Sequence, residues 1–305
     1  MESELFEIPY QAGVCYEHNK GLILPEKVPY IGMGSSYFAT LVLRYQGIKI
    51  YPEIASEYFN YLEKVRQFEK AVLISQSGES SETLWCADRF EQFVPIVNEL
   101  RSPLANHPAA DVAVDLCAGR ERFSSTKTYI NTLTVLFLGH GIDPQPALEY
   151  NQLYFPSFKA RGDEWGQLTC RLLKKRKYKG FYILGAGPNL GTAMQAAQVL
   201  TEATKLPFIG MSLAQYDHGV KEAAGCSVVF VINPVGEQGE RTAKLIEKIA
   251  FASGFCIELK ETGLPENLSP FATIMPFFFM AAWLRRKLKI KEPFVVGGKV
   301  TRVTS

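Results

Sequence analysis

The chain has 305 residues, about twice the usual length of a single domain, so one large domain or two medium domains are expected. Apolar residues make up 47% of the chain and charged residues 21%, which is ordinary for a globular protein with a substantial core. The 33 Lys and Arg nearly balance the 31 Asp and Glu, which excludes the basic surface that nucleic acids or anionic membranes require. A single anion held by backbone N–H groups remains compatible with this balance.

The cysteines and histidines are scattered along the chain, with no CxxC pair and no HExxH motif. We therefore expect no metal site, no disulfide framework, no cofactor and a reducing, cytoplasmic setting. The acidic start of the chain has no signal-peptide pattern. The longest apolar run, residues 270–284, is too short to span a membrane and contains Pro276, so we expect a soluble protein in which this run is a buried helix or a subunit contact.

Taken in chain order, short apolar runs end in Gly- and Ser-rich loops, and the loops open into segments with helical spacing. The predicted strands of the first half are 28–31, 71–74, 94–97 and 112–116, and its predicted helices are 37–45, 82–90 and 125–138. The second half repeats this order, with strands at 181–184, 227–232 and 256–259 and helices at 190–204, 241–251 and the apolar run. Such alternation is typical of parallel, doubly wound sheets.

Two Gly-x-Gly turns, beginning at Gly32 and Gly185, follow the first predicted strand of each half. Their 153-residue offset indicates a duplicated unit, and the polar stretch 151–179 is typical of a linker with an opening helix, which gives a boundary near Tyr154. The predicted fold is α/β, with two tandem, doubly wound, flavodoxin-like domains and a C-terminal tail. The predicted segments are residues 1–27, 28–154 (first domain), 155–290 (second domain) and 291–305 (tail).

Two loops of the first half have the chemistry to hold a phosphate where strands end and helices begin. The candidate phosphate ligands are Ser35, Ser36, Ser75, Gln76, Ser77 and Ser80. Serines in such places often only cap helices, and for either loop alone capping is the better interpretation. Two hydroxyl-dense loops at equivalent points of adjacent units favour phosphate. The second half lacks such loops, since 233–237 has no hydroxyl.

Dinucleotide binding is a rival interpretation of the turn that starts at Gly185. The turn fits GxGxxxG rather than GxGxxG, and no acidic residue about 20 positions later could hold a ribose. A P-loop motif is also absent from the sequence.

Several motifs together resemble the sugar isomerase (SIS) family. Ser75-Gln-Ser-Gly-Glu, Glu53-Ile-Ala-Ser-Glu-Tyr and Ser125-Thr-Lys-Thr are similar to the first SIS domain in the isomerase half of glucosamine–fructose-6-phosphate aminotransferase. Leu200-Thr-Glu, with Asp217-His-Gly following, is similar to its second SIS domain. Only 27 residues precede the first predicted strand, so we expect no glutaminase domain and a closer likeness to SIS-type glucosamine-6-phosphate deaminases.

The resemblance implies roles for single residues. The phosphate site falls on the six residues above, the proton-transferring glutamate on Glu202, the ring-opening histidine on His218 and a tail lysine on Lys299. It also implies a homodimer in which His218 comes from the partner subunit. Two positions depart from the pattern, because Gln195 stands in an acidic position and Val199 in a lysine position.

Each catalytic candidate also has a plain structural interpretation. Glu202 could form a surface ion pair with Lys205, His218 could be a turn residue, and Lys299 could be a solvated lysine near the terminus. We predict a phosphosugar isomerase/deaminase that converts glucosamine 6-phosphate to fructose 6-phosphate and ammonia, or the reverse. The alternatives are another phosphosugar isomerase or deglycase, and a sugar-phosphate sensor without catalysis.

Overall fold

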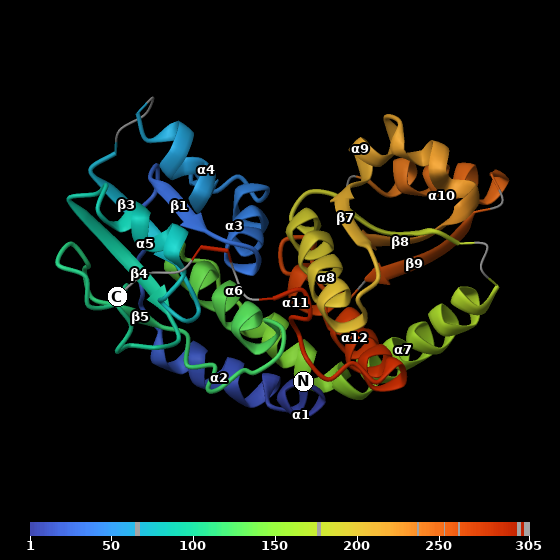
Figure 1. Ribbon diagram of the computed structural model, residues 1–305, viewed down its shortest axis with the longest axis horizontal. Coiled ribbons are helices and arrows are strands. Elements are labelled where there is room, and N and C mark those ends of the chain that lie inside the picture. Colours follow the sequence, from blue (N-terminus) through green and yellow to red (C-terminus); the bar gives the residue numbers. More distant parts are fainter. Residues whose placement is uncertain are drawn as a thin grey trace. The chain divides into compact units, whose positions relative to one another are not determined.

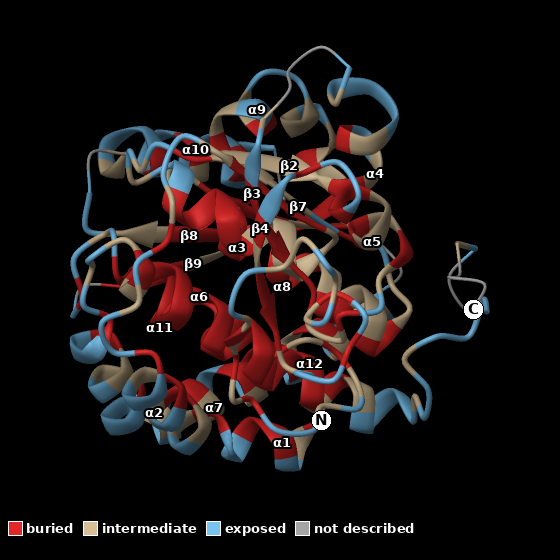
Figure 2. Cartoon of the chain, turned by 90° about the vertical axis from the view of Figure 1, so that its left-hand side faces the viewer, coloured by how far each residue is buried: buried red, intermediate tan, exposed pale blue. Residues whose placement is uncertain are grey.

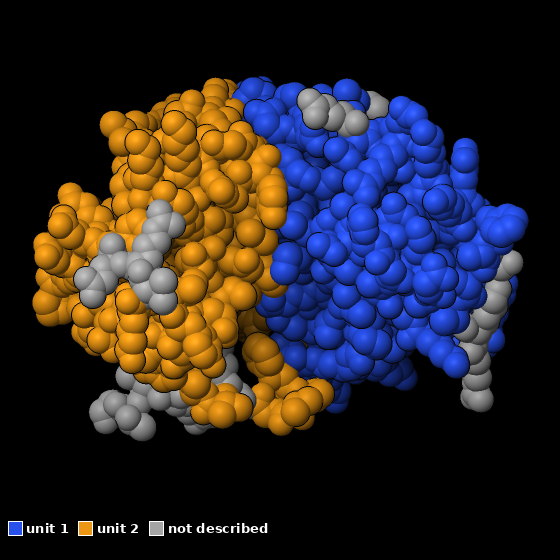
Figure 3. Space-filling model, turned by 90° about the horizontal axis from the view of Figure 1, so that it is seen from above, with its two compact units in different colours: residues 1–5, 146–293 blue, residues 6–145, 294–305 orange. Residues whose placement is uncertain are grey.

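The computed structural model describes residues 1–64, 68–175, 178–236, 238–252, 254–261, 263–297 and 300–301. The chain divides into two compact units, each of which contains its own β-sheet (Figure 3). Unit 1 comprises residues 1–5 and 146–293, and unit 2 comprises residues 6–145 and 294–305.

Unit 2 has a parallel sheet with the strand order β2-β1-β3-β4-β5. The strands are β1 (Pro29–Gly32), β2 (Tyr51–Ile54), β3 (Lys70–Ile74), β4 (Gln92–Val97) and β5 (Val114–Asp115). Burial is deepest inside each unit, where Figure 2 shows the chain in red. All of β1 is buried, and so are the last four residues of β3. Continuous burial of this kind is expected for central strands that have helices on both faces.

The helices of unit 2 cover both faces of its sheet (Figure 1). They are α2 (Ile8–His18), α3 (Ser35–Arg44), α4 (Ala55–Glu57), the π-helical turn η1 (Tyr58–Leu62), α5 (Ser81–Ala87) and α6 (Lys127–Gly139). One face carries α4, η1 and α5, where Tyr58 and Cys86 join a core with Leu73 and Phe93. On the other face, α6 packs against both α2 and α3.

Unit 1 has a second parallel sheet with the order β7-β6-β8-β9, the same sequential pattern as β2-β1-β3-β4. Its strands are β6 (Gly180–Gly185), β7 (Phe208–Ser212), β8 (Ser227–Pro234) and β9 (Phe255–Glu261). Its helices are α1 (Glu2–Phe6), α7 (Gln145–Lys174), α8 (Asn189–Thr204), α9 (Leu213–Asp217), the 3₁₀ helix η2 (Val220–Cys226), α10 (Gly239–Phe251), α11 (Ser269–Thr273) and α12 (Met275–Leu288).

Successive residues of β8 enter different cores on the two faces of the sheet. Val229 and Val231 join the core formed with α9 and α10. Phe230 contacts Trp165 of α7 and Phe277 of α12, with ring centroids 5.6 and 5.7 Å away. This alternation is the period-two geometry of a strand that is buried on both faces.

Two glycines let α7 and α12 approach each other closely. A Cβ on Gly162 would lie 2.5 Å from the backbone oxygen of Pro276, and one on Gly166 would lie 2.6 Å from the Trp283 ring. The 30-residue helix α7 therefore packs on α12 in spite of Pro156 inside it.

Most of the predicted strands and helices are confirmed, with ends that shift by a few residues. Strands β2 and β7 were not predicted from the sequence. The apolar run, predicted as one helix, forms the two helices α11 and α12. The stretch 151–179, expected to be a linker and an opening helix, is continuous with α7 as far as Lys174. Among the described residues, no helix combines the length and apolar character needed to cross a membrane.

Candidate functional site

The first hydroxyl-rich loop follows β1 directly. Gly34 is the N-cap of α3 and has φ 53°, a conformation that glycine adopts readily, so Ser35 and Ser36 form the first turn of the helix. A Cβ on Gly32 would lie 2.7 Å from the Ser36 Cβ, so only glycine lets the helix start this close to the strand. Within the described part of the chain, neither serine side chain has a hydrogen-bond partner.

The second loop, residues 75–80, follows β3 and is tightly folded. The Gly78 N–H donates to the Ser75 carbonyl oxygen at 3.0 Å, and the Ser75 hydroxyl donates to the Ser80 hydroxyl at 3.3 Å. The Ser77 hydroxyl accepts a hydrogen bond from the Glu79 N–H at 3.2 Å. No hydrogen bond of the Gln76 side chain occurs within the described residues. The loop thus holds its backbone in place while leaving this amide available to a ligand.

The sheet register brings the two loops to the same edge. Gly32 and Ile74 are paired neighbours in β1 and β3, so the loops leave adjacent strands at their carboxyl ends. The structure therefore places both loops, which contain the six predicted phosphate ligands, at the same edge of the sheet. Parallel α/β sheets commonly bind ligands at this edge.

Helix capping does not account for these serines. The N-cap of α3 is Gly34, and Ser80, the N-cap of α5, makes no side-chain hydrogen bond to the helix. Thr83, in the first turn of α5, is fully buried, and its hydroxyl has no partner among the described residues. The interpretation in which the hydroxyls merely cap helices is therefore wrong for both helices.

Glu202 lies in the last turn of α8 and is half-buried. Its carboxylate accepts a hydrogen bond from the Gln198 side chain at 3.0 Å, one turn earlier on the same helix. Gln198 was not predicted as a site residue, although its i, i+4 spacing from Glu202 on a predicted helix indicates that the two side chains can meet.

The alternative in which Glu202 forms an ion pair with Lys205 is not what the structure has. Lys205 caps α8 in the left-handed conformation, and its ammonium donates to the backbone carbonyls of Glu202, at 2.6 Å, and of Pro293. Burial lowers the pKa of Lys205, partly opposed by the nearby charge of Glu202. Among the described residues, the Glu202 carboxylate is therefore held by an amide and forms no ion pair.

Gln195 and Val199, the two departures from the SIS pattern, are both buried in α8. Their burial explains why neutral side chains suit these positions, since an unpaired charge there would be strongly unfavourable. Neither position can therefore supply the charged side chain that the SIS pattern has there, an acidic one at Gln195 and a lysine at Val199.

His218 directly follows α9 and is exposed, and its backbone N–H closes the helix on Ala214 and Gln215. The preceding Asp217 forms ion pairs with Lys221, at 2.8 Å, and with Arg241, at 3.6 Å. The hydrogen bond from Lys221 is the main cause that lowers the pKa of Asp217. No hydrogen bond joins Glu202 to His218 in the described part of unit 1.

The serine loops belong to unit 2, whereas Glu202 and His218 belong to unit 1. Lys299, the predicted tail lysine, lies outside the described residues.

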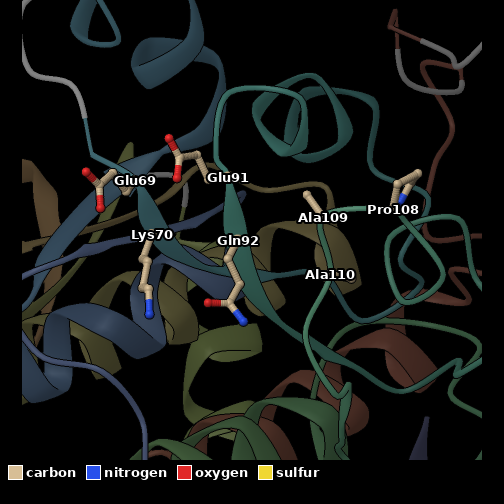
Figure 4. Close-up of a pocket in the computed structure, with 7 residues that line it drawn as sticks. All are labelled: Glu69, Lys70, Glu91, Gln92, Pro108, Ala109 and Ala110. Atoms are coloured by element: carbon tan, nitrogen blue, oxygen red, sulfur yellow. The ribbon is translucent and has the colours of Figure 1, made fainter.

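A pocket of about 410 Å³ lies at the opposite end of the unit 2 sheet (Figure 4). It is lined by Glu69, Lys70, Glu91, Gln92, Pro108, Ala109 and Ala110, which include the first residues of β3 and β4. Two of its lining side chains are carboxylates and none carries a hydroxyl, so its chemistry does not suit a phosphate.

Parallel sheets covered by helices, with polar loops after the strand ends, define an α/β protein of the kind that commonly binds ligands at the carboxyl edge of a sheet. Comparison with known proteins narrows this class. The chain is 28% identical over 239 residues to a glutamine–fructose-6-phosphate aminotransferase of Methanothermobacter thermautotrophicus, with 73% of this chain and 40% of the relative covered. The chain thus spans less than half the length of this curated relative.

Solved structures give the same picture of the fold. The C-terminal domain of glucosamine-fructose-6-phosphate aminotransferase from Francisella tularensis matches with a TM-score of 0.75 and 17% identity, over 94% of this chain and 95% of that one. A glucosamine-6-phosphate deaminase from Thermotoga maritima matches with a TM-score of 0.70 and 19% identity, over 95% and 96%. No protein-family model matches the chain. The relatives and the fold confirm the resemblance to the sugar isomerase (SIS) family.

Proposed function

We propose that this chain is a phosphosugar isomerase/deaminase that converts glucosamine 6-phosphate and water into fructose 6-phosphate and ammonia, or catalyses the reverse reaction. The main support is the pair of hydroxyl-rich loops at the carboxyl ends of the neighbouring strands β1 and β3. The names of its relatives and structural neighbours, an aminotransferase of fructose 6-phosphate and a glucosamine-6-phosphate deaminase, support the substrate class.

The phosphate is assigned to the loops of unit 2. Ser35 and Ser36 lie in the first turn of α3, a ten-residue helix whose dipole and N–H groups favour an anion there. The side chains of Ser75, Gln76, Ser77 and Ser80 supply further donors. A phosphate held by hydroxyl and N–H groups explains how a chain with a formal charge of only +2 could select an anionic sugar.

The proton transfer is assigned to Glu202. In the open-chain amino sugar, its carboxylate would remove the proton from C2 and return it to C1, which leaves an imine at C2. Water then adds to the imine carbon, the C–N bond breaks, and ammonia leaves as the ketone forms. The hydrogen bond from Gln198 would hold the Glu202 carboxylate in one orientation during both transfers.

The remaining roles follow the SIS pattern. We assign ring opening to His218, whose exposed imidazole has one nitrogen that can donate a proton and one that can accept it. We assign Lys299 to contact with the sugar, and we propose a homodimer in which His218 acts in the site of the partner subunit. No metal or organic cofactor takes part in these steps.

An ammonia assay tests the function. The full-length chain is incubated with glucosamine 6-phosphate, and ammonia release is compared with that of Glu202→Gln and of the control Glu222→Gln, which alters an exposed carboxylate. Loss of the proton-transferring group should lower kcat by at least about a hundredfold, while the control keeps its rate.

Other outcomes would contradict the proposal in distinct ways. Aldose–ketose conversion without ammonia release would favour a simple phosphosugar isomerase. Sugar-phosphate binding without any turnover, unaffected by Glu202→Gln, would favour a sensor, an interpretation that the neutral Gln195 and Val199 keep open.

A further inference from the structure

Three metal-ligating side chains from distant parts of the sequence converge at one end of unit 2. The donor atoms of His18, Asp115 and Cys117 all lie within 4.8 Å of one another. His18 is the last residue of α2, Asp115 is the last residue of β5, and Cys117 follows two residues later. The sequence analysis expected no metal site because these residues form no short motif.

Backbone and side-chain hydrogen bonds fix this cluster. The Asn19 amide donates to the Asp115 carbonyl oxygen at 3.0 Å and to the Cys15 carbonyl oxygen at 2.9 Å, and so ties the end of α2 to the end of β5. The Cys117 N–H donates to one carboxylate oxygen of Asp115 at 2.8 Å. Cys117 itself has φ 50°, a conformation that costs a non-glycine residue about 1 kcal/mol and that turns the chain sharply after the strand.

The Cys117 thiol makes one long hydrogen bond, to the Asp115 carbonyl oxygen at 3.7 Å, which a metal ion would replace. His18 is exposed, and within the described residues its imidazole has no hydrogen-bond partner. Asp115 and Cys117 are half-buried, so the cluster lies at the surface with one open side. It also lies at the carboxyl end of α2, where the helix dipole favours a cation.

We propose that His18, Asp115 and Cys117 form a binding site for a borderline transition-metal ion such as Zn²⁺. Imidazole, carboxylate and thiolate are the three ligand types that proteins offer zinc, at distances of about 2.0–2.3 Å, and a water completes the tetrahedron. The thiolate disfavours Mg²⁺ and Ca²⁺, which take oxygen ligands. Ligand atoms around zinc lie about 3–4 Å apart, so small side-chain rotations would close the cluster on the ion.

Binding exchanges a proton for the metal. A cysteine binds zinc as the thiolate, so the Cys117 thiol must release its proton when the metal binds. The metal–sulfur bond forms as the S–H proton passes to solvent, and no electron is transferred.

The test uses the full-length chain after removal of metal with a chelator, without any sugar phosphate. Zn²⁺ is titrated in competition with a chromophoric chelator, and Co²⁺ is used as a spectroscopic probe. We expect one ion per chain and a near-ultraviolet thiolate-to-cobalt band. His18→Ala and Cys117→Ser should each lower the affinity at least about tenfold, and Cys117→Ser should abolish the band.

Two variants serve as matched controls. His107→Ala removes a histidine that pairs with Asp88 at 3.1 Å, and Cys226→Ser removes another half-buried thiol. Both should bind zinc as the native chain does. Thermal unfolding of the metal-free variants shows whether each of them folds. If Cys117→Ser does not fold, His18→Ala still tests the proposal, because His18 is exposed and its replacement should leave the fold intact. Equal zinc affinity in His18→Ala and the native chain, or no binding at all, would overturn the proposal.

Discussion

At the scale of single residues, the loop 75–80 depends on Gly78. This glycine has φ 64°, and a Cβ there would lie 2.0 Å from the Ser102 hydroxyl oxygen and 2.3 Å from the Ser102 Cβ. Both the conformation and the space around it exclude a side chain. The tight fold that presents Gln76 and Ser77 is therefore set by one residue without a side chain.

Gly78→Ala should lower the free energy of unfolding by about 2–4 kcal/mol, because it combines backbone strain with overpacking. Gly47→Ala is the matched control, since Gly47 has φ 90° but a Cβ added there would meet no atom within 4 Å. That control should lose only about 1 kcal/mol, the strain alone. Urea unfolding measures the free energy of unfolding of both variants. Equal decreases would show that the Ser102 side chain moves aside at little energetic cost and that overpacking does not contribute.

The sequence predicted which side chains occur in the candidate site, but it did not predict which groups these side chains contact. Ser75 to Ser80 could be found because hydroxyls cluster after a predicted strand. The orientation of Lys205 toward carbonyl groups could not, because it depends on a left-handed cap that lysine seldom adopts. The meeting of His18 with Cys117 could not be predicted either, since it depends on where α2 ends relative to β5.

At the scale of elements, the start of α6 is held by a carboxylate from outside the helix. Glu121 accepts hydrogen bonds from the N–H groups of Thr126 and Lys127 and from the Thr126 hydroxyl, each at 2.8 Å, and also from the Thr128 hydroxyl. Burial raises the pKa of Glu121, and these hydrogen bonds oppose the shift. One side chain thus replaces the ordinary cap, which Thr126 does not provide.

Glu121→Gln should lower the free energy of unfolding by about 1–3 kcal/mol, because an amide has one acceptor oxygen in place of two and accepts hydrogen bonds more weakly than a carboxylate. Glu91→Gln, at an exposed carboxylate, should change it by less than about 0.5 kcal/mol. Denaturant unfolding of both variants measures these changes in the free energy of unfolding. A Glu121→Gln variant as stable as the control would mean that water replaces the carboxylate at the start of α6.

Physical reasons explain why some strands and part of one helix were not predicted. β2 and β7 are edge strands, and they contain Pro52 and Gly210, residues that weaken a strand pattern but are tolerated at a sheet edge. The central strands were found because burial on both faces requires continuous apolar runs. The polar character of residues 151–179 predicted a linker with an opening helix, whereas most of this stretch belongs to α7, in which Gly162 allows close packing against α12.

At the scale of the whole molecule, the proposed exchange of His218 between subunits makes a sharp prediction. Glu202→Gln and His218→Asn should each be inactive as pure proteins. When the two are co-expressed, about half of the dimers are mixed, and one of the two sites in each mixed dimer has both native residues. Activity should then recover to about a quarter of the native value.

Light scattering of the same samples establishes whether the chain is a dimer. A mixture that stays inactive while mixed dimers form would show that Glu202 and His218 act from the same chain. Full activity in a monomer would exclude the shared site altogether.

Each unit is assembled from two separate stretches of chain, and this limits how the protein can be divided. Residues 1–5 belong with the sheet that starts at β6, and Glu2 reaches Arg286 of α12 at 2.6 Å. A gene fragment that begins at residue 146 would lack that segment, and one that ends at residue 145 would carry it without its counterpart. The two units therefore cannot be exchanged as single continuous segments. Exchanging one of them between related proteins, in the laboratory or in evolution, would require three crossovers, at residues 5/6, 145/146 and 293/294.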